Sequence, residues 1–214
     1  MRLRVCCSEQ GNPGLNLKEL YETPPQLNMI ELRTALLVID MIGEFVTGRL
    51  GGAHAEAVLP CIVRLVEAAR RGGSPVVYVT DAHLEGVDRE FDVWGSHAVA
   101  GSPEAEIVPE LEPGMGDHRL YKRRYSAFYA TGLDALLREL GVEAVVLTGV
   151  LTNICIQHTA ADAFYRGYRV IVPTDCVNAL TPGEQEASLS YMKRMYGAEL
   201  TYSAAVSGVL EASR

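Results

Sequence analysis

The residue that most strongly suggests chemistry is Cys155, which lies between an apolar segment and an amphipathic one. Residues 144–147 suit a buried strand, and apolar residues then recur at helical spacing from Ile156. A thiol in the first turn of a helix faces unpaired N–H groups and the positive end of the helix dipole, and both favour the thiolate. A lone cysteine is more often a small buried hydrophobic residue. The strand–turn–helix context reverses that preference, so we take Cys155 as a candidate nucleophile.

Two charged residues also stand at the ends of predicted strands. Asp40 follows the apolar run 35–39, and Lys122 ends a short strand that begins at His118. In a doubly wound sheet with strand order 3-2-1-4-5-6, the first and fourth strands are neighbours, which would bring Asp40 beside Cys155. A carboxylate can take the thiol proton and pass it to a leaving nitrogen, while an ammonium group stabilises the charge. Each residue alone is a weak signal, because a lysine in a basic cluster is usually a surface residue.

A second group of polar residues follows the second predicted strand. Asp81 and His83 are two residues apart, so in an extended chain their side chains leave on the same side. His97 follows in a long loop that is rich in glycine and proline. One carboxylate and two imidazoles suit Zn²⁺, Mn²⁺ or Fe²⁺. Three such residues in a loop are, however, more often simply solvated.

These residues need a framework in which strands and helices alternate. Helices are predicted at about 55–71, after 131, after 155 and from 181 to 197, and the loop 84–117 shows no clear period. Six strands are predicted, at residues 35–39, 75–79, 118–121, 144–147, 168–172 and 198–202. The alternation favours a doubly wound, mostly parallel α/β sheet. A TIM barrel would need eight strands and about 250 residues.

Composition limits the class of protein further. The chain has 214 residues, 48% of them hydrophobic, and a formal net charge of −8. This suits one large domain and argues against a nucleic-acid partner. We find no apolar run that could span a membrane and no signal peptide, and five cysteines without paired ligand spacing suggest the cytoplasm. We expect an N-terminal arm at 1–33, a domain at 34–214, and a homo-oligomer, either a dimer or a tetramer.

Three segments together resemble the isochorismatase-like cysteine hydrolases, a family that includes the nicotinamidases. They are ALLVIDM at 35–41, KRRYSAF at 122–128 and LTGVLTNICIQHTAADAFYRGY at 147–168. The last is the most specific, because it matches the family pattern G-V-x-T-x-x-C-V-x-x-T-x-x-D-A except for one isoleucine. The resemblance implies a three-layer α/β/α fold.

The resemblance also assigns roles to individual residues. It implies Asp40 as general acid/base, Lys122 as its electrostatic partner, Cys155 as nucleophile, and a cis peptide between Val150 and Leu151. In one departure, the Asn-Asp-Phe that commonly follows the acid is Gly-Glu-Phe here, at residues 43–45.

The loop after the second strand is similar to a nicotinamidase metal site. There an Asp-x-His motif leads to Trp-x-x-His, which here is Trp94-x-x-His97, and Glu90 lies where some members supply a further ligand. The family's Trp-His-Pro around the first histidine and the cysteine after the last are absent. The resemblance implies a divalent transition metal (Zn, Mn or Fe) and no organic cofactor. The residues expected to contact substrate are Phe45, Trp94, Tyr125 and Leu151.

The leading functional hypothesis is hydrolysis of a small primary amide, most directly nicotinamide to nicotinate and ammonia, through a cysteine thioester. The alternatives are hydrolysis of another small amide, carbamoyl or ureido compound, and isochorismatase-type ether hydrolysis, which does not need a nucleophilic thiol. A third class is a non-catalytic small-molecule binder on the same fold. The presence of Asp40, Lys122 and Cys155 together favours the amidohydrolase.

Overall fold

The computed structural model describes residues 32–212. The predicted arm, residues 1–33, therefore lies almost wholly outside the described residues. The strands are β1 (Thr34–Ile39), β2 (Val76–Asp81), β3 (His118–Lys122), β4 (Ala144–Val150), β5 (Arg169–Pro173), β6 (Val177–Asn178) and β7 (Glu199–Thr201). The α-helices are α2 (Gly43–Val46), α3 (Ala53–Gly72), α4 (Phe91–Trp94), α5 (Leu133–Glu139), α6 (Gln157–Tyr165), α7 (Pro182–Tyr196) and α8 (Ser203–Ala212).

The sheet has the predicted doubly wound topology. Its strands run in the order β3-β2-β1-β4-β5-β7, and the pairings between them are all parallel. Counted without β6, this is the order 3-2-1-4-5-6 that we expected. The two-residue strand β6 pairs with the end of β4 and makes the sheet seven-stranded rather than six-stranded. A strand this short carries no apolar periodicity, which is why the sequence did not indicate it.

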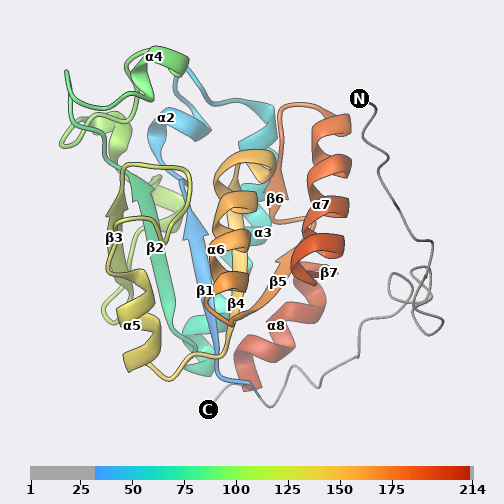
Figure 1. Ribbon diagram of the computed structural model, residues 1–214. Coiled ribbons are helices and arrows are strands. Elements are labelled where there is room, and N and C mark those ends of the chain that lie inside the picture. The colour runs from blue at the N-terminus through green and yellow to red at the C-terminus, as the bar shows by residue number, and fades with distance from the viewer. Residues whose placement is uncertain (1–31, 213–214) are drawn as a thin grey trace, which may run out of the picture.

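Helices cover both faces of the sheet, because successive residues of each buried strand point to opposite sides. One face packs against α5, α6 and α7 through a core that includes Leu37, Leu133, Leu147, Ala160 and Met192. The opposite face packs against α3 and α8 through Leu36, Ile62, Val146, Val206 and Leu210. Figure 1 shows α6 in front of the sheet and α3 behind it. This is the three-layer α/β/α arrangement.

Three helices were not predicted. The short α2 lies between β1 and α3, the segment 84–117 contains the short α4, and α8 follows the last strand. None of the helices within residues 32–212 is long and apolar enough to cross a membrane.

The close contact of β1 with β4 places the two principal parts of the site side by side. Ile39 is in register with Gly149, so Asp40 leaves the sheet next to the segment that leads to Cys155. Gly149 has a φ of 115°, and a Cβ added there would lie 1.9 Å from the Ile39 carbonyl oxygen. Only glycine therefore permits this approach of the two backbones.

Candidate active site

Lys122 occupies the centre of a buried cluster at the carboxyl ends of the strands. Its Nζ lies 2.7 Å from Asp40 Oδ2, 2.7 Å from Asp81 Oδ1 and 3.5 Å from Cys155 Sγ. The four residues come from the ends of β1, β2 and β3 and from the turn after β4, and none of their side chains is more than slightly exposed. The sheet thus brings together the three residues that the sequence suggested for catalysis, and it adds Asp81 to them.

Asp40 is held in one orientation by its neighbours. Its Oδ1 accepts a hydrogen bond from the Asp81 main-chain N–H at 2.8 Å, and its Oδ2 faces Lys122. Its φ of 56° lies in the left-handed region, which Asp tolerates better than most residues. The missing asparagine at residues 43–45 therefore does not leave the carboxylate without a hydrogen-bond donor.

Burial and charge set the protonation behaviour of the cluster. Burial and the nearby Asp81 carboxylate raise the pKa of Asp40 to about 6, against the opposing effect of Lys122. Burial alone would lower the pKa of Lys122, but the Asp40 and Asp81 carboxylates raise it well above its usual value. Lys122 is therefore charged, and Asp40 can exchange a proton near neutral pH.

The thiol of Cys155 behaves differently from the expectation based on the helix start. Burial raises the pKa of Cys155 well above its usual value, and Asp40 and Asp81 add to this although Lys122 opposes it. The resting group is accordingly a thiol rather than a thiolate. Its proton has a nearby acceptor, because Cys155 Sγ and a carboxylate oxygen of Asp40 lie within 4.8 Å of each other.

The segment that carries Cys155 is a turn rather than the first turn of an ordinary α-helix. Residues Thr152–Ile156 form a π-helical turn, and α6 begins at Gln157. Leu151 O accepts hydrogen bonds from Ile154 N at 3.1 Å and Ile156 N at 3.2 Å. The peptide bond between Val150 and Leu151 is cis, at the position that the resemblance implied.

The four residues suggested as metal ligands form a second cluster, which adjoins the first. Asp81, His83, Glu90 and His97 are all buried, and one ligand atom from each lies within 4.8 Å of those of the others. His83 Nε2 lies 3.5 Å from Asp81 Oδ2 and 3.7 Å from Glu90 Oε2, and it is buried without a hydrogen-bond partner. The ligand atoms of two imidazoles and two carboxylates thus lie close together, and one of the imidazole nitrogens has no hydrogen-bond partner. This set of groups fits a divalent transition metal.

Two contacts orient the histidines of this cluster. Asp88 Oδ2 lies 3.2 Å from His83 Nδ1, and the Gly95 carbonyl oxygen lies 2.7 Å from His97 Nδ1. Partners of this kind fix the tautomer and leave Nε2 free to ligate. Asp88 was not predicted, because an acidic residue in a polar loop gives no distinguishing signal. Arg123 and Arg124 hold its carboxylate in place and keep the pKa of Asp88 well below its usual range.

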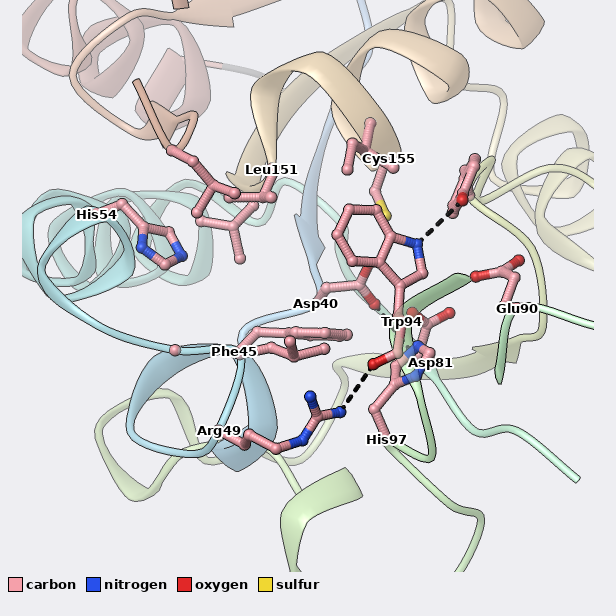
Figure 2. A pocket seen from close by; sticks show the side chains of 16 residues that line it. Asp40, Phe45, Arg49, His54, Asp81, Glu90, Trp94, His97, Leu151 and Cys155 are labelled. Atoms are coloured by element: carbon pink, nitrogen blue, oxygen red, sulfur yellow. Dashed lines mark hydrogen bonds between the residues drawn. The ribbon is translucent and has the colours of Figure 1, made fainter. Parts of the chain in front are cut away.

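Both clusters open into one cavity of about 250 Å³. Figure 2 shows Trp94 among these side chains, with Cys155 above its ring, Asp40, Asp81 and His97 below it, and Glu90 to its right. Trp94 Nε1 donates to Tyr125 Oη at 3.1 Å. The four residues expected to contact substrate, Phe45, Trp94, Tyr125 and Leu151, all line this cavity. Arg49, His54, Ile154 and Leu180 line it too and were not predicted.

Comparison with known proteins agrees with this geometry. The isochorismatase domain model matches residues 34–205. A solved N-carbamoylsarcosine amidase from Thermoplasma acidophilum is 42% identical, with a TM-score of 0.75 over 80% of this chain and 97% of that one. A solved pyrazinamidase of Pyrococcus horikoshii in complex with zinc is 28% identical, with a TM-score of 0.74 over 79% of this chain and 99% of that one. Nicotinamidase 3 of Arabidopsis thaliana is 32% identical over 160 residues, which are 72% of this chain and 78% of the relative.

The domain match covers most of the chain and the whole sheet, and the similar proteins include amidases that act on different compounds. This chain therefore belongs to the isochorismatase-like hydrolase family.

Proposed function

We propose that this protein hydrolyses the terminal C–N bond of a small primary amide through a thioester on Cys155, with nicotinamide as the first candidate substrate. The observation that carries the proposal is the buried Lys122, which contacts Asp40, Asp81 and Cys155 at once. A binding protein would gain little from burying this charged group beside a thiol, whereas thiol attack on an amide needs a nucleophile, a proton acceptor and a fixed positive charge.

In the first half of the reaction Asp40 accepts the Cys155 proton, and the sulfur attacks the amide carbonyl carbon. The N–H groups of the Leu151–Cys155 turn are suited to stabilise the oxyanion that forms. Asp40 then passes its proton to the amide nitrogen as the C–N bond breaks, and ammonia leaves. The raised pKa of Asp40, about 6, suits both directions of this proton transfer.

In the second half water hydrolyses the thioester. Asp40 takes a proton from the attacking water, the C–S bond breaks, and the proton returns to the sulfur. Carboxylic acid and the resting enzyme result, so Asp40 and Cys155 are ready for another cycle.

The second cluster, of candidate metal ligands, serves substrate binding in this proposal. A divalent metal held by Asp81, His83, Glu90 and His97 would supply a Lewis-acid site for a ring nitrogen. Trp94 and Phe45 are then available to pack on the faces of a planar ring. The zinc complex of the similar pyrazinamidase supports this choice of metal type.

A carbamoyl or ureido compound is the second candidate substrate. It is favoured by the 42% identity to an N-carbamoylsarcosine amidase, which exceeds the 32% identity to Nicotinamidase 3. The same chemistry applies, because the carbamoyl group also ends in a C–NH₂ bond next to a carbonyl.

Ammonia release from a panel of amides tests the proposal. The full chain is assayed with nicotinamide, benzamide and N-carbamoylsarcosine, with added Zn²⁺ and after chelation. Benzamide has the same ring size but no ring nitrogen, so a preference for nicotinamide that disappears on chelation would support metal binding of that nitrogen. Release from N-carbamoylsarcosine alone would support the second candidate. No ammonia from any amide would overturn amide hydrolysis in favour of ether hydrolysis or a binding role.

A further inference from the structure

Arg49 is presented to the cavity from a tightly folded turn between α2 and α3. The turn packs directly on the backbone of α2 and leaves no room for side chains at its glycines. A Cβ at Gly48 would lie 2.7 Å from Glu44 Cα, and one at Gly51 would lie 2.6 Å from Val46 O. Gly51 N donates to Gly48 O at 3.0 Å and closes the turn around Arg49. The backbone that carries the Arg49 side chain is therefore held in one conformation.

The far end of this side chain reaches the loop that follows α4. Arg49 Nη2 donates to the carbonyl oxygens of Trp94 and Ser96, each at 3.0 Å, and Figure 2 shows the contact with Trp94. On the other side Arg49 Nε lies 4.0 Å from the buried Glu44 carboxylate. One guanidinium nitrogen thus holds the two carbonyls on either side of Gly95.

The Gly95 carbonyl group, which lies between the other two in sequence, is in contact with His97, a histidine of the second cluster. Gly95 O lies 2.7 Å from His97 Nδ1. A carbonyl oxygen only accepts hydrogen bonds, so His97 Nδ1 carries the proton and Nε2 is left as the ligand atom. The three successive carbonyls therefore form a chain of contacts from Arg49 to the imidazole of His97.

We propose that Arg49 is a positioning residue that fixes the segment Trp94–His97, so that His97 can ligate the metal and Trp94 can form a wall of the cavity. This inference rests on the metal site proposed above. Arg49 itself is placed outside both clusters and touches neither the thiol nor a metal ligand side chain in the contacts described. Its effect on the site passes through the backbone of residues 94–96.

The sequence supplies a direct probe, because Trp94 is the only tryptophan among the 214 residues. Arg49→Met removes the donors and keeps an extended side chain. We expect acrylamide to quench Trp94 fluorescence more strongly in this variant than in the wild type. The dissociation constant for Zn²⁺, measured by competition with a chromophoric chelator, should rise by up to about 10- to 100-fold, which is the loss expected when a direct partner of a metal ligand is removed. Arg49→Lys, which keeps a donor and the charge, should recover part of both effects.

Arg138→Met is the matched control. Its side chain is 54% exposed, against 55% for Arg49, and it also donates to a main-chain carbonyl, that of Arg166. Equal Trp94 quenching and Zn²⁺ affinity in Arg49→Met and wild type would overturn the inference, and so would the same changes in Arg138→Met. A wild-type protein that binds no Zn²⁺ would overturn the proposed metal site, and Trp94 quenching would then decide whether Arg49 fixes the loop.

Discussion

At the scale of single residues, the site depends on one lysine ammonium that is shared by two carboxylates and a thiol. Burying such a group is unfavourable unless its hydrogen-bonding partners are also charged, and Asp40 and Asp81 meet that condition at 2.7 Å each. The arrangement leaves Asp40 with a pKa of about 6 and Cys155 protonated at rest. The sequence suggested a thiolate because only the helix start could be seen, and the burial of the sulfur could not.

Replacing the proposed nucleophile tests the chemistry most directly. Cys155→Ala should lower kcat by about 10³-fold or more, because no thioester can form, while the protein stays folded. Ammonia release and thermal unfolding are measured on the same preparation. Cys61→Ala removes a partly buried thiol outside the cavity and should keep wild-type activity. A folded Cys155→Ala protein with near wild-type turnover would contradict the cysteine mechanism.

Removing the shared cation should affect stability as well as activity. Lys122→Met leaves two buried carboxylates without their counter-ion, and breaking such a pair costs about 3–5 kcal/mol. We expect the lower end of this range, because one carboxylate can take up a proton. Urea unfolding gives the change in the free energy of unfolding, and Lys193→Met, at an exposed position on α7, is the control. Equal stability of the two variants would show that Lys122 is not the electrostatic centre of the cluster.

At the scale of elements, the pairing of β1 with β4 positions the site. It places the end of β1, which carries Asp40, against the end of β4, which leads into the Thr152–Ile156 turn. The strands and their order could be predicted, because buried parallel strands read as continuous apolar runs between helical segments. The strand β6 could not, because it depends on contacts between β4 and residues 176–178 that are distant in sequence. The π-helical turn could not either, because its five residues show no apolar period that separates them from α6.

Gly149 offers a test of this close approach. Gly149→Ala should lower the free energy of unfolding well beyond the cost of the backbone conformation alone, because its Cβ would meet the Ile39 carbonyl oxygen at 1.9 Å. Gly167→Ala is the matched control, since Gly167 also has a positive φ, of 82°, but no atom within 4 Å of an added Cβ. That control should lose only about 1–2 kcal/mol. Similar losses in the two variants, measured by urea unfolding, would mean that the β1–β4 contact can relax.

At the scale of the whole molecule, residues far apart in the chain meet at the carboxyl edge of the sheet. The sequence indicated the members of both clusters by their positions after strands and by the resemblance. It did not indicate that Asp81 joins the two clusters through its two oxygens, with Oδ1 at Lys122 and Oδ2 near His83. Nor did it indicate Arg49, whose role depends on where a loop of the second cluster lies relative to the turn after α2. Such relations follow only from the three-dimensional arrangement.

Metal binding should therefore stabilise the whole domain and not only the loop. A ligand that binds the folded state alone adds about 2.7 kcal/mol to the free energy of unfolding at a free concentration of 100 times its Kd. Chelation should accordingly lower the melting temperature and raise KM for nicotinamide more than it lowers kcat, since binding rather than bond cleavage is lost. His97→Ala should abolish the stabilisation by Zn²⁺, whereas His118→Ala, at the start of β3, should retain it. Elemental analysis must show that the chelated protein is metal-free. Full activity on nicotinamide and an unchanged melting temperature in that protein would leave Asp81, His83, Glu90 and His97 without a role in metal binding.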